Sequence, residues 1–338
     1  MYNKINTQAH VLVKSKGERT MYSIGIDLGG TNIAAGIVND ANEIVRKAST
    51  PTNANRPAEE IARDMADLCL RLIDEAALTK EDIAYIGIAT PGTADSDAGV
   101  VVYSNNLPFV DFPIAKLLSE YTGIARVIID NDANAAAKGE AVAGAAKGYA
   151  KSVMITLGTG VGGGIIIDNK IYSGFNYAGA ELGHIVIEHN GAPCSCGRRG
   201  CWEAYSSATA LIRMTKEKIA AVGEKSKMYE MVGGDLERVS GRTAFEAARA
   251  GDVYGQEVVD MYLDYLANGI ANIINIFQPE ILSIGGGVSN ERDNLLVPLK
   301  ERVSKLTYGH SYLKKNTDIR IAMLRNDAGI IGAAVLGK

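Results

Sequence analysis

The sequence predicts an α/β protein built from a duplicated core, and two patterns support this. Along the 338 residues, segments with the apolar pattern of β-strands alternate with segments of helical spacing, which is typical of α/β domains. A strand–Gly–Thr–strand unit also occurs twice, near residues 27–32 and near residues 155–160. This internal repeat indicates two related halves with a ligand between them.

The first half is predicted to contain short strands and three helices. Residues 83–90 (IAYIGIAT) are apolar almost throughout, as in a buried strand, and end at Pro91-Gly92. Residues 57–78 begin at Pro57, which suits a helix start, and repeat apolar side chains at helical spacing: Ile61, Met65, Leu68 and Leu72. In chain order we expect elements over 22–28, 33–38, 43–49, 57–78, 83–90, 113–122, 127–130 and 133–146.

The second half is predicted to be richer in helix. Strong helical patterns cover residues 203–221 and 254–277, and Pro279 closes the second of them. Residues 280–290 indicate a strand, a glycine turn and the beginning of a helix. The other elements that we expect are strands over 152–157, 162–168 and 319–324, and a C-terminal helix over 328–336.

The composition argues against two classes of partner. The formal net charge is −4 and charged residues make up 22% of the chain, so nothing indicates binding to nucleic acid or to an anionic membrane surface. No apolar run reaches the roughly 18 residues of a membrane span, and the first twenty residues lack the apolar core of a secretory signal. We therefore expect a cytoplasmic protein with no membrane partner, in which residues 1–20 are a disordered tail.

The first glycine-rich turn offers a site for nucleotide phosphates. It reads DLGGTN between two strands, and its candidate residues are Asp27, Gly29, Gly30, Thr31 and Asn32. Glycines permit a tight turn and a close approach of phosphate to backbone amides, while the Asp can orient Mg²⁺ directly or through water. The turn is not a P-loop, since the sequence has no GxxxxGK followed by Ser or Thr. A plain hairpin turn is the alternative interpretation.

Two later glycine turns strengthen the interpretation of the first as a phosphate site. Gly158, Thr159 and Gly160 belong to the repeated strand–turn–strand unit, and Gly286 and Gly287 follow a strand and precede a helix. A helix N-terminus presents free N–H groups to an anion. For the last turn, close packing of a strand on a helix is the alternative.

Four metal-ligating residues form the most specific local pattern. His184, Cys194, Cys196 and Cys201 have the spacing H-x9-C-x-C-x4-C, and Zn²⁺ prefers four nitrogen and sulfur ligands in a tetrahedron. Without a secretion signal, clustered cysteines favour a metal over disulfides. Because three Cys and one His close the shell, we expect a structural zinc ion. His189 is a rival ligand, and reduced thiols without an ion are the alternative.

Asp132 is the candidate for the group that accepts a proton from a substrate hydroxyl. It follows the buried strand over 127–130 and precedes a helix, which is where ligand sites of α/β proteins cluster. Phosphoryl transfer to an alcohol needs such a carboxylate, besides in-line placement and charge neutralisation. The alternative is that Asp132 only caps the helix, since N-caps favour Asp.

Glu181, His184 and Glu203 bracket the cysteine-rich loop and are candidates for sugar contacts. A sugar presents many hydroxyls, and carboxylates beside a rigid metal loop would supply acceptors in fixed positions. The alternative for Glu203 is that it begins a helix and stabilises its dipole. Both roles can coexist.

Together these residues resemble the ROK family of repressors, open reading frames and sugar kinases, from about Met21 to the C-terminus. The motifs that carry the resemblance are DLGGTN at 27–32, TPG at 90–92, NDANAAA at 131–137, LGTGVGGG at 157–164, ELGH at 181–184 and CSCGRRGCWE at 194–203. The resemblance implies an actin-like, RNase H-like ATPase fold of two lobes around a central cleft. We expect the smaller lobe over residues 21–137, with a C-terminal helix of about 325–338 returning to it, and the larger lobe, with the zinc loop, over 138–324.

The resemblance also assigns roles to single residues. It implies that Asp132 is the general base on the sugar 6-hydroxyl, that His184 and the three cysteines hold zinc, and that the turns at 27–32, 158–160 and 285–287 clamp ATP. The sugar contacts that it implies are Gly92, Asn106 (or its neighbour Asn105), Asn131, Glu181, His184 and Glu203.

The function that the resemblance implies is an ATP-dependent glucokinase that uses Mg²⁺ with ATP and forms a homodimer. Kinases for fructose, mannose, allose or N-acetylmannosamine share most of these residues, so another hexose or N-acetylhexosamine is the first alternative. A non-catalytic sugar-sensing protein is the second. Repressors of the family carry a winged helix-turn-helix before the first lobe, which twenty residues without helical periodicity cannot build. We therefore expect the kinase branch and no nucleic-acid partner.

Overall fold

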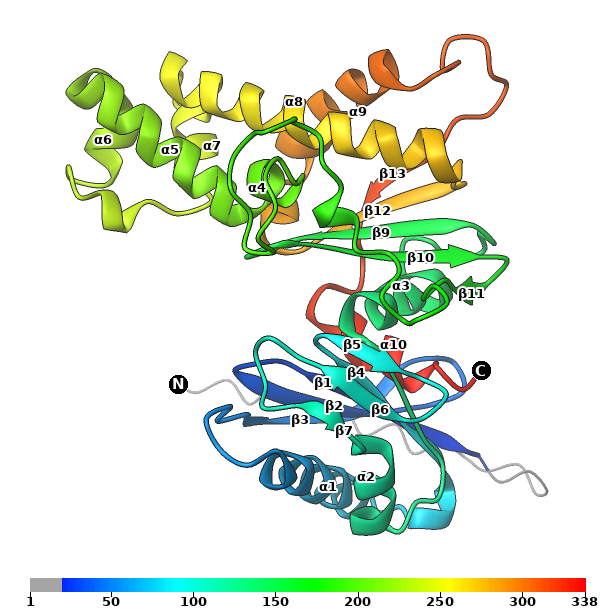
Figure 1. Ribbon diagram of the computed structural model, residues 1–338. Coiled ribbons are helices and arrows are strands. Elements are labelled where there is room, and N and C mark those ends of the chain that lie inside the picture. Colours follow the sequence, from blue (N-terminus) through cyan, green and yellow to red (C-terminus); the bar gives the residue numbers. More distant parts are fainter. Residues whose placement is uncertain (1–19) are drawn as a thin grey trace, which may run out of the picture.

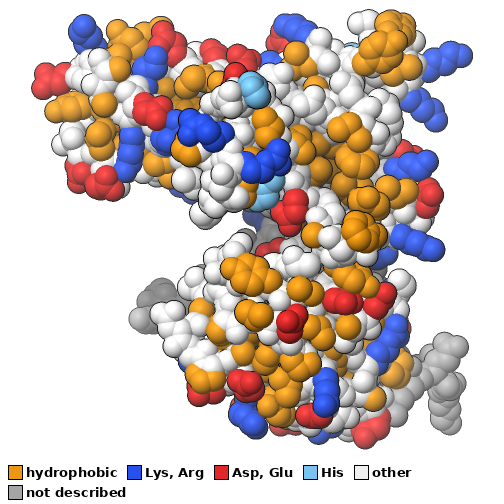
Figure 2. All heavy atoms as spheres, viewed as in Figure 1, with side chains coloured by type: hydrophobic (Ala, Val, Ile, Leu, Met, Phe, Trp, Pro, Cys, Tyr) orange, Lys and Arg blue, Asp and Glu red, His pale blue; other side chains and the backbone are white. Residues whose placement is uncertain are grey.

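The protein contains two bodies, each built on a five-stranded sheet, joined by a layer that holds helices α3 and α10 (Figure 1). The computed structural model describes residues 20–338, so the tail expected over residues 1–20 lies outside the described residues except for its last member. Figure 2 shows that the surface is hollowed at the waist between the two bodies, where histidine and acidic side chains gather.

The first sheet has the order β3-β2-β1-β4-β8. Its strands, in that order, cover Ile44–Pro51, Asn32–Val38, Tyr22–Leu28, Ile83–Thr90 and Val127–Asn131. Strand β1 runs antiparallel to β2 and parallel to β4, which is itself parallel to β8. Strand β4 is buried at every residue but Ala84, as its apolar run predicts for a strand covered on both faces.

Two helices and a small sheet complete the first body. Helix α1 (Ala58–Glu75) buries the four apolar residues whose spacing predicts it, and α2 (Ile114–Thr122) packs beside it. Helix α2 ends at Gly123, whose φ of 73° is the left-handed conformation that glycine adopts freely. The small antiparallel sheet has the order β5-β6-β7, with strands Thr93–Asp95, Val100–Tyr103 and Val110–Phe112.

The second sheet repeats the topology of the first. Its order is β11-β10-β9-β12-β13, over Lys170–Ile171, Val161–Ile167, Ser152–Leu157, Ile281–Gly285 and Asp318–Ile321. Strand β9 is antiparallel to β10 and parallel to β12, as β1 is to β2 and β4. The duplicated core predicted from the repeated turn is thus confirmed. The last strand is shorter than the predicted 319–324, because residues 325–327 turn into a 3₁₀ helix.

Helices cover the outer side of the second sheet (Figure 1). They are α4 (Glu203–Ser206), α5 (Ala208–Val222), α6 (Lys227–Met231), α7 (Thr243–Arg249), α8 (Val253–Phe277) and α9 (Asp293–Leu306). The helix predicted over 203–221 is broken, because the Ser207 side chain accepts a hydrogen bond from Ala210 N at 3.0 Å and starts α5 as its N-cap. Short 3₁₀ helices cover Lys80–Asp82, Leu182–His184, Gly223–Lys225, Leu236–Arg238, Gly287–Glu291 and Arg325–Asp327.

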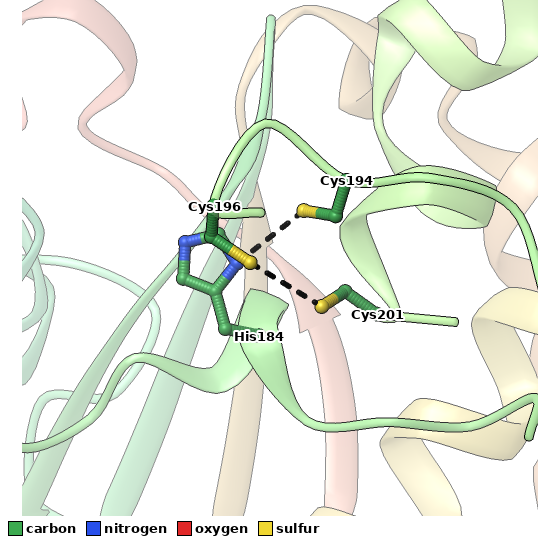
Figure 3. Close-up of side chains that lie close together, drawn as sticks. All are labelled: His184, Cys194, Cys196 and Cys201. Carbon is green, nitrogen blue, oxygen red and sulfur yellow. Dashed lines mark hydrogen bonds between the residues drawn. The ribbon is translucent and has the colours of Figure 1, made fainter. Parts of the chain in front are cut away.

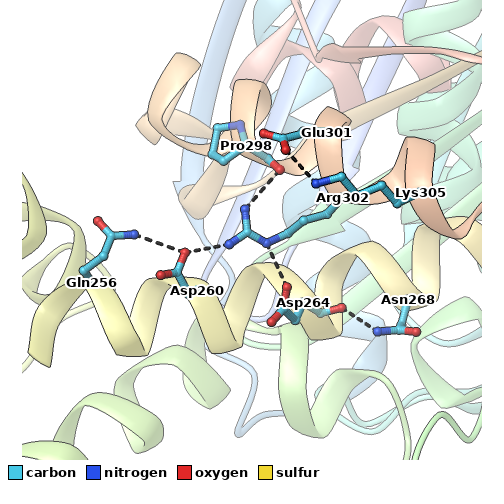
Figure 4. Close-up of polar contacts among 8 residues, drawn as sticks. All are labelled: Gln256, Asp260, Asp264, Asn268, Pro298, Glu301, Arg302 and Lys305. Carbon is cyan, nitrogen blue, oxygen red and sulfur yellow. Dashed lines mark hydrogen bonds and ion pairs between the residues drawn. The ribbon is translucent and has the colours of Figure 1, made fainter. Parts of the chain in front are cut away.

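Helices α8 and α9 of the second body are held together by Arg302 (Figure 4). From α9, its Nη2 lies 2.6 Å from Asp260 and its Nε 2.8 Å from Asp264, which are one helical turn apart on α8. Across residues 20–338, not even the 25-residue α8 is both long and apolar enough to cross a membrane.

Helices α3 (Asp132–Ala143) and α10 (Ala328–Ala334) lie between the sheets and pack against each other. Helix α10 lies so close to the first sheet that a Cβ at Gly25 would meet Ile330 O at 1.9 Å, and one at Gly87 would meet Ala333 O at 1.8 Å. These glycines therefore let the helix backbone rest directly on β1 and β4. Helix α3 packs on β9 and β10 of the second sheet as well as on α10, so the two helices fill the space between the sheets.

Candidate active site

The four predicted metal ligands meet at one point (Figure 3). Their ligand atoms all lie within 4.8 Å of one another. Cys194 Sγ is 3.7 Å from His184 Nδ1, and Cys196 Sγ is 3.6 Å from Cys201 Sγ. Tetrahedral zinc with Zn–S bonds of about 2.3 Å places its sulfur ligands about 3.8 Å apart. The donor set and its spacing therefore fit one zinc ion with a closed shell.

A glycine with positive φ and a side-chain hydrogen bond hold the cysteine-bearing loop folded back on itself. Gly200 has a φ of 80°, and a Cβ there would lie 1.7 Å from Glu188 O. Arg198 adds a hydrogen bond from Nη1 to the carbonyl of His184 at 3.1 Å. His189, the rival ligand, stays outside the group of four, and its ring instead contacts Asn190 at 3.1 Å.

Glu203 joins the metal loop to the second glycine turn. Its Oε2 accepts a hydrogen bond from Val161 N at 3.0 Å, and its Oε1 accepts one from Ser195 Oγ at 3.3 Å. A Cβ at Gly160 would meet Oε2 at 2.3 Å, so a side chain at this turn position would displace the Glu203 carboxylate. Glu203 is also the first residue of α4, so the predicted helix-start role and the link to the site coexist.

The cap of α3 is Asn131 and not Asp132. Asn131 Oδ1 accepts hydrogen bonds from Ala133 N at 2.9 Å and Asn134 N at 3.2 Å, while its Nδ2 donates to Gly92 O at 3.0 Å. The alternative in which Asp132 only caps the helix is therefore wrong. Asp132 stands in the first turn of α3, and one of its oxygens accepts from Ala133 N at 2.8 Å.

Three carboxylates from distant parts of the chain share one electrostatic neighbourhood. Burial raises the pKa of Asp132, and the charge of Glu181 raises it further. Burial, followed by the charge of Asp132, raises the pKa of Asp27 to about 6. Asp27 ends close to α10, since a Cβ at Gly329 would lie 2.4 Å from its carboxyl carbon. Such a cluster of acids favours a cation or a proton donor between them.

The second and third glycine turns lie side by side. A Cβ at Gly286, whose φ is 82°, would meet both N and O of Leu157 at 2.5 Å, directly before Gly158. Thr159 O accepts a hydrogen bond from Thr209 Oγ1 at 2.8 Å. Gly287 has open space at its Cβ position, which leaves room for a ligand against its backbone.

The first turn belongs to the other sheet. Gly29 N donates to Asn32 O at 2.9 Å and closes it. Thr31 and Asn32 are exposed, and a Cβ at Gly30 would lie 3.5 Å from Asn106 Cβ. Asn106 is thus placed against this turn.

A family comparison decides what kind of protein carries this arrangement. The family model described as "ROK family" matches residues 23–338. The chain belongs to the ROK family. The family resemblance predicted from the motifs is confirmed, and with it the two-lobed fold of ROK proteins.

Three ROK relatives illustrate the range of the family. A glucokinase of Thermotoga maritima is 38% identical, over 93% of this chain and 96% of the relative. A solved ROK glucokinase of Streptomyces griseus, in complex with glucose and AMPPNP, is 32% identical with a TM-score of 0.78, over 93% of this chain and 98% of that one. A xylose repressor of Bacillus subtilis is 30% identical, over 86% of this chain and 71% of the relative.

Two buried polar residues beneath the site, Asp130 and Asn134, were not among the predicted site residues. Asp130 Oδ1 accepts hydrogen bonds from Asn131 N at 2.7 Å and Asn134 Nδ2 at 2.9 Å. Burial raises the pKa of Asp130, although these hydrogen bonds oppose the shift. The apolar run before Asp130 was the only sequence signal that it is buried, and the pair holds the strand-to-helix corner at which Asn131 and Asp132 stand.

Proposed function

We propose that the protein is an ATP-dependent glucokinase that transfers the terminal phosphoryl group of ATP to the 6-hydroxyl of glucose. The observation that carries this is the placement of Asp132. Its neighbour Asn131 caps α3 in its stead, so the Asp132 carboxylate is available to a substrate. The similarity to ROK glucokinases over nearly the whole chain supports the same activity.

Asp132 acts as the general base. As the sugar hydroxyl attacks the terminal phosphorus, its proton passes to the Asp132 carboxylate, which is a stronger base than an exposed Asp because burial and Glu181 raise its pKa. The base sits at the N-terminus of α3, so its helix holds it in a fixed position.

The nucleotide binds to the three glycine turns. Backbone amides of residues 29–32, 158–160 and 286–287 receive the phosphates, since Gly286 packs the third turn against the end of β9 beside the second. Mg²⁺ that arrives with ATP would be held by Asp27, directly or through water, and supplies neutralisation of the phosphate charge. The pKa of Asp27, raised to about 6 in the ligand-free protein, is consistent with a site that awaits a cation.

The sugar binds between the metal loop and the start of α3. Zinc held by His184, Cys194, Cys196 and Cys201 would fix that loop. His184 Nδ1 faces Cys194, so its Nε2 is the ring atom that remains for a hydroxyl. The other contacts that we propose are Gly92, Asn106, Asn131, Glu181 and Glu203.

We also propose how the chain divides and assembles. The lobes comprise residues 21–137 and 138–324, and α10 returns to the first lobe, as its packing on β1 supports.

The protein forms a homodimer, for which the exposed apolar side chains at the ends of α8 and α9 provide surface: Ile276, Leu306 and Tyr308 are 68%, 44% and 78% exposed. Free cysteines at the metal site suit a reducing cytoplasm.

The test is a coupled ADP-release assay with ATP over glucose, fructose, mannose, allose and N-acetylmannosamine. We expect the highest kcat/KM with glucose; a higher value for another sugar would reassign the substrate. Turnover with none of them, together with glucose binding by calorimetry, would leave a sugar sensor. Asp132→Asn should bind glucose normally and lose about 10²- to 10⁴-fold in kcat, whereas Asp67→Asn, on the exposed face of α1, should match the wild type.

A further inference from the structure

Glu140 is a fully buried carboxylate that binds backbone N–H groups from two distant segments. It lies in the last turn of α3 and is 0% exposed. Its Oε2 accepts from Ala145 N at 2.6 Å and Met323 N at 3.1 Å, and its Oε1 accepts from Leu324 N at 2.7 Å. A buried carboxylate is costly unless hydrogen bonds satisfy it, so this set of contacts holds the side chain firmly.

The two segments are the connections through which the chain passes between the sheets. Residues 144–151 lead from α3, which follows the first sheet, to β9 of the second sheet. Residues 322–327 lead from β13 of the second sheet to α10, which packs on the first. One carboxylate thus ties both connections to the C-terminal end of α3.

Each of the two helices between the sheets, α3 and α10, reaches the proposed active site. Asp132 stands at the N-terminal end of α3, two turns before Glu140. Helix α10, which the second connection leads to, contacts Asp27 at Gly329. A shift of the second connection relative to α3 would move α10, which packs on β1 and Asp27, against the helix that carries Asp132.

We propose that Glu140 is a positioning residue that sets the hinge between the two lobes, and so the alignment of the base with the nucleotide. The inference rests on the proposed kinase function for its effect on rate. Glu140 touches no substrate and acts through the two connections. Misplacement of reacting groups by about 1 Å can cost about 10²-fold in rate, so a loosened hinge should lower kcat more than it changes KM.

Two variants disturb the carboxylate in different ways. Glu140→Gln keeps the size, but each oxygen accepts at least one N–H, so the amide NH₂ must face a donor in either orientation. Gly144→Ala keeps Glu140 but places a Cβ 2.0 Å from its Oε2 and displaces it. The matched control is Glu280→Gln, because Glu280 Oε2 accepts from Ala150 N at 2.8 Å and Lys151 N at 3.0 Å. It holds the same first connection without reaching the second.

The experiment measures kcat and KM for glucose and ATP well below each variant's melting temperature. We expect Glu140→Gln and Gly144→Ala to lower kcat at least about tenfold with KM within about threefold, and Glu280→Gln to stay near the wild type. Unchanged kcat in Glu140→Gln, or an equal loss in Glu280→Gln, would overturn the proposal.

Amide hydrogen exchange of the full chain tests the hinge apart from activity. In Glu140→Gln, protection at residue 145 and at residues 323–324 should fall together. In Glu280→Gln the single amide oxygen can keep both bonds of Glu280 Oε2, so protection at residues 323–324 should stay unchanged. Retained protection at 323–324 in Glu140→Gln would refute the hinge role. If the wild type turned over no sugar, the kinase assignment would fail while this exchange result still decided the role of Glu140.

Discussion

One carboxylate oxygen of Glu203 accepts a hydrogen bond from the backbone N–H of Val161 at 3.0 Å, and the other lies 3.3 Å from the hydroxyl of Ser195. Val161 directly follows the second glycine turn, and Ser195 lies between two of the metal-binding cysteines. Glu203 therefore couples the turn proposed for phosphate to the loop proposed for sugar.

We expect Glu203→Gln to raise the KM for glucose by about 10- to 100-fold, because a hydrogen bond to a charged group contributes about 1.5–3 kcal/mol. The Gln oxygen can keep the bond from Val161 N only if its NH₂ group faces Ser195. Steady-state kinetics with varied glucose measures the effect. Glu188→Gln, an exposed position of the same loop, is the control and should leave KM unchanged; an unchanged KM in Glu203→Gln itself would rule out the sugar contact.

Removal of the metal should loosen the sugar site without destroying the nucleotide turns. We expect Cys196→Ser to lose zinc, to melt at a lower temperature and to raise the KM for glucose more than that for ATP, because the ordered loop depends on a closed ligand shell. Metal analysis by mass spectrometry and thermal unfolding provide the measurements. Cys69→Ala changes a buried cysteine in α1, outside the cluster, and should keep one zinc per chain. A wild-type chain purified without any zinc would contradict the metal assignment.

The raised pKa of Asp27 predicts how stability depends on pH. The folded protein holds this proton up to about pH 6, while an unfolded Asp releases it near pH 3.9. Stability therefore falls as pH rises between these values, and stays lower above them. Asp27→Asn removes this loss, so the variant should gain about 1–3 kcal/mol over the wild type on going from about pH 4 to about pH 8.

Urea unfolding of the ligand-free protein near both pH values measures this difference. Turnover of Asp27→Asn should fall, since the carboxylate proposed for Mg²⁺ is lost, so the substitution exchanges activity for stability. The exposed Asp67→Asn should show the same stability as the wild type at both pH values. A gain for Asp27→Asn that is equal at both would show that its carboxyl has an ordinary pKa.

The packing of α10 on β1 predicts one severe backbone effect. Gly25→Ala should cost at least about 3 kcal/mol or prevent soluble expression, because its Cβ would lie 1.9 Å from the carbonyl of Ile330 and the helix must move. Gly241→Ala, where nothing lies within 4 Å, should change stability by less than about 0.5 kcal/mol. Chemical denaturation compares the two. Similar stabilities would mean that the helix can retreat from the sheet at little cost.

Local patterns in the sequence predicted the parts of the site that local chemistry defines. The histidine and three cysteines converge because their spacing is short and their loop turns at Gly197 and Gly200, whose φ values are 84° and 80°. The repeated turn predicted the repeated sheet, since each turn joins the first two strands of its sheet in chain order, β1 to β2 and β9 to β10.

Residues whose roles depend on tertiary contacts could not be predicted in this way. Asn131 and Asp132 are both good N-cap residues, so only the backbone at the strand-to-helix corner decides which of them caps α3. From the sequence alone, Glu140 resembles an ordinary surface residue of a helix, because its partners at 323–324 are more than 180 residues away. The break before α5 was hidden because Ser207 sits inside a continuous helical pattern.

The packing of α10 on β1 has a consequence for biosynthesis. Strand β1 (22–28) is among the first segments to leave the ribosome, yet the helix that covers it comprises residues 328–334. Chain growth is vectorial, and domains usually fold as they emerge. Residues 91–327 must still be translated after β4 before α10 is made. The face of β1 and β4 beneath α10 therefore stays uncovered in the nascent chain until the final helix arrives.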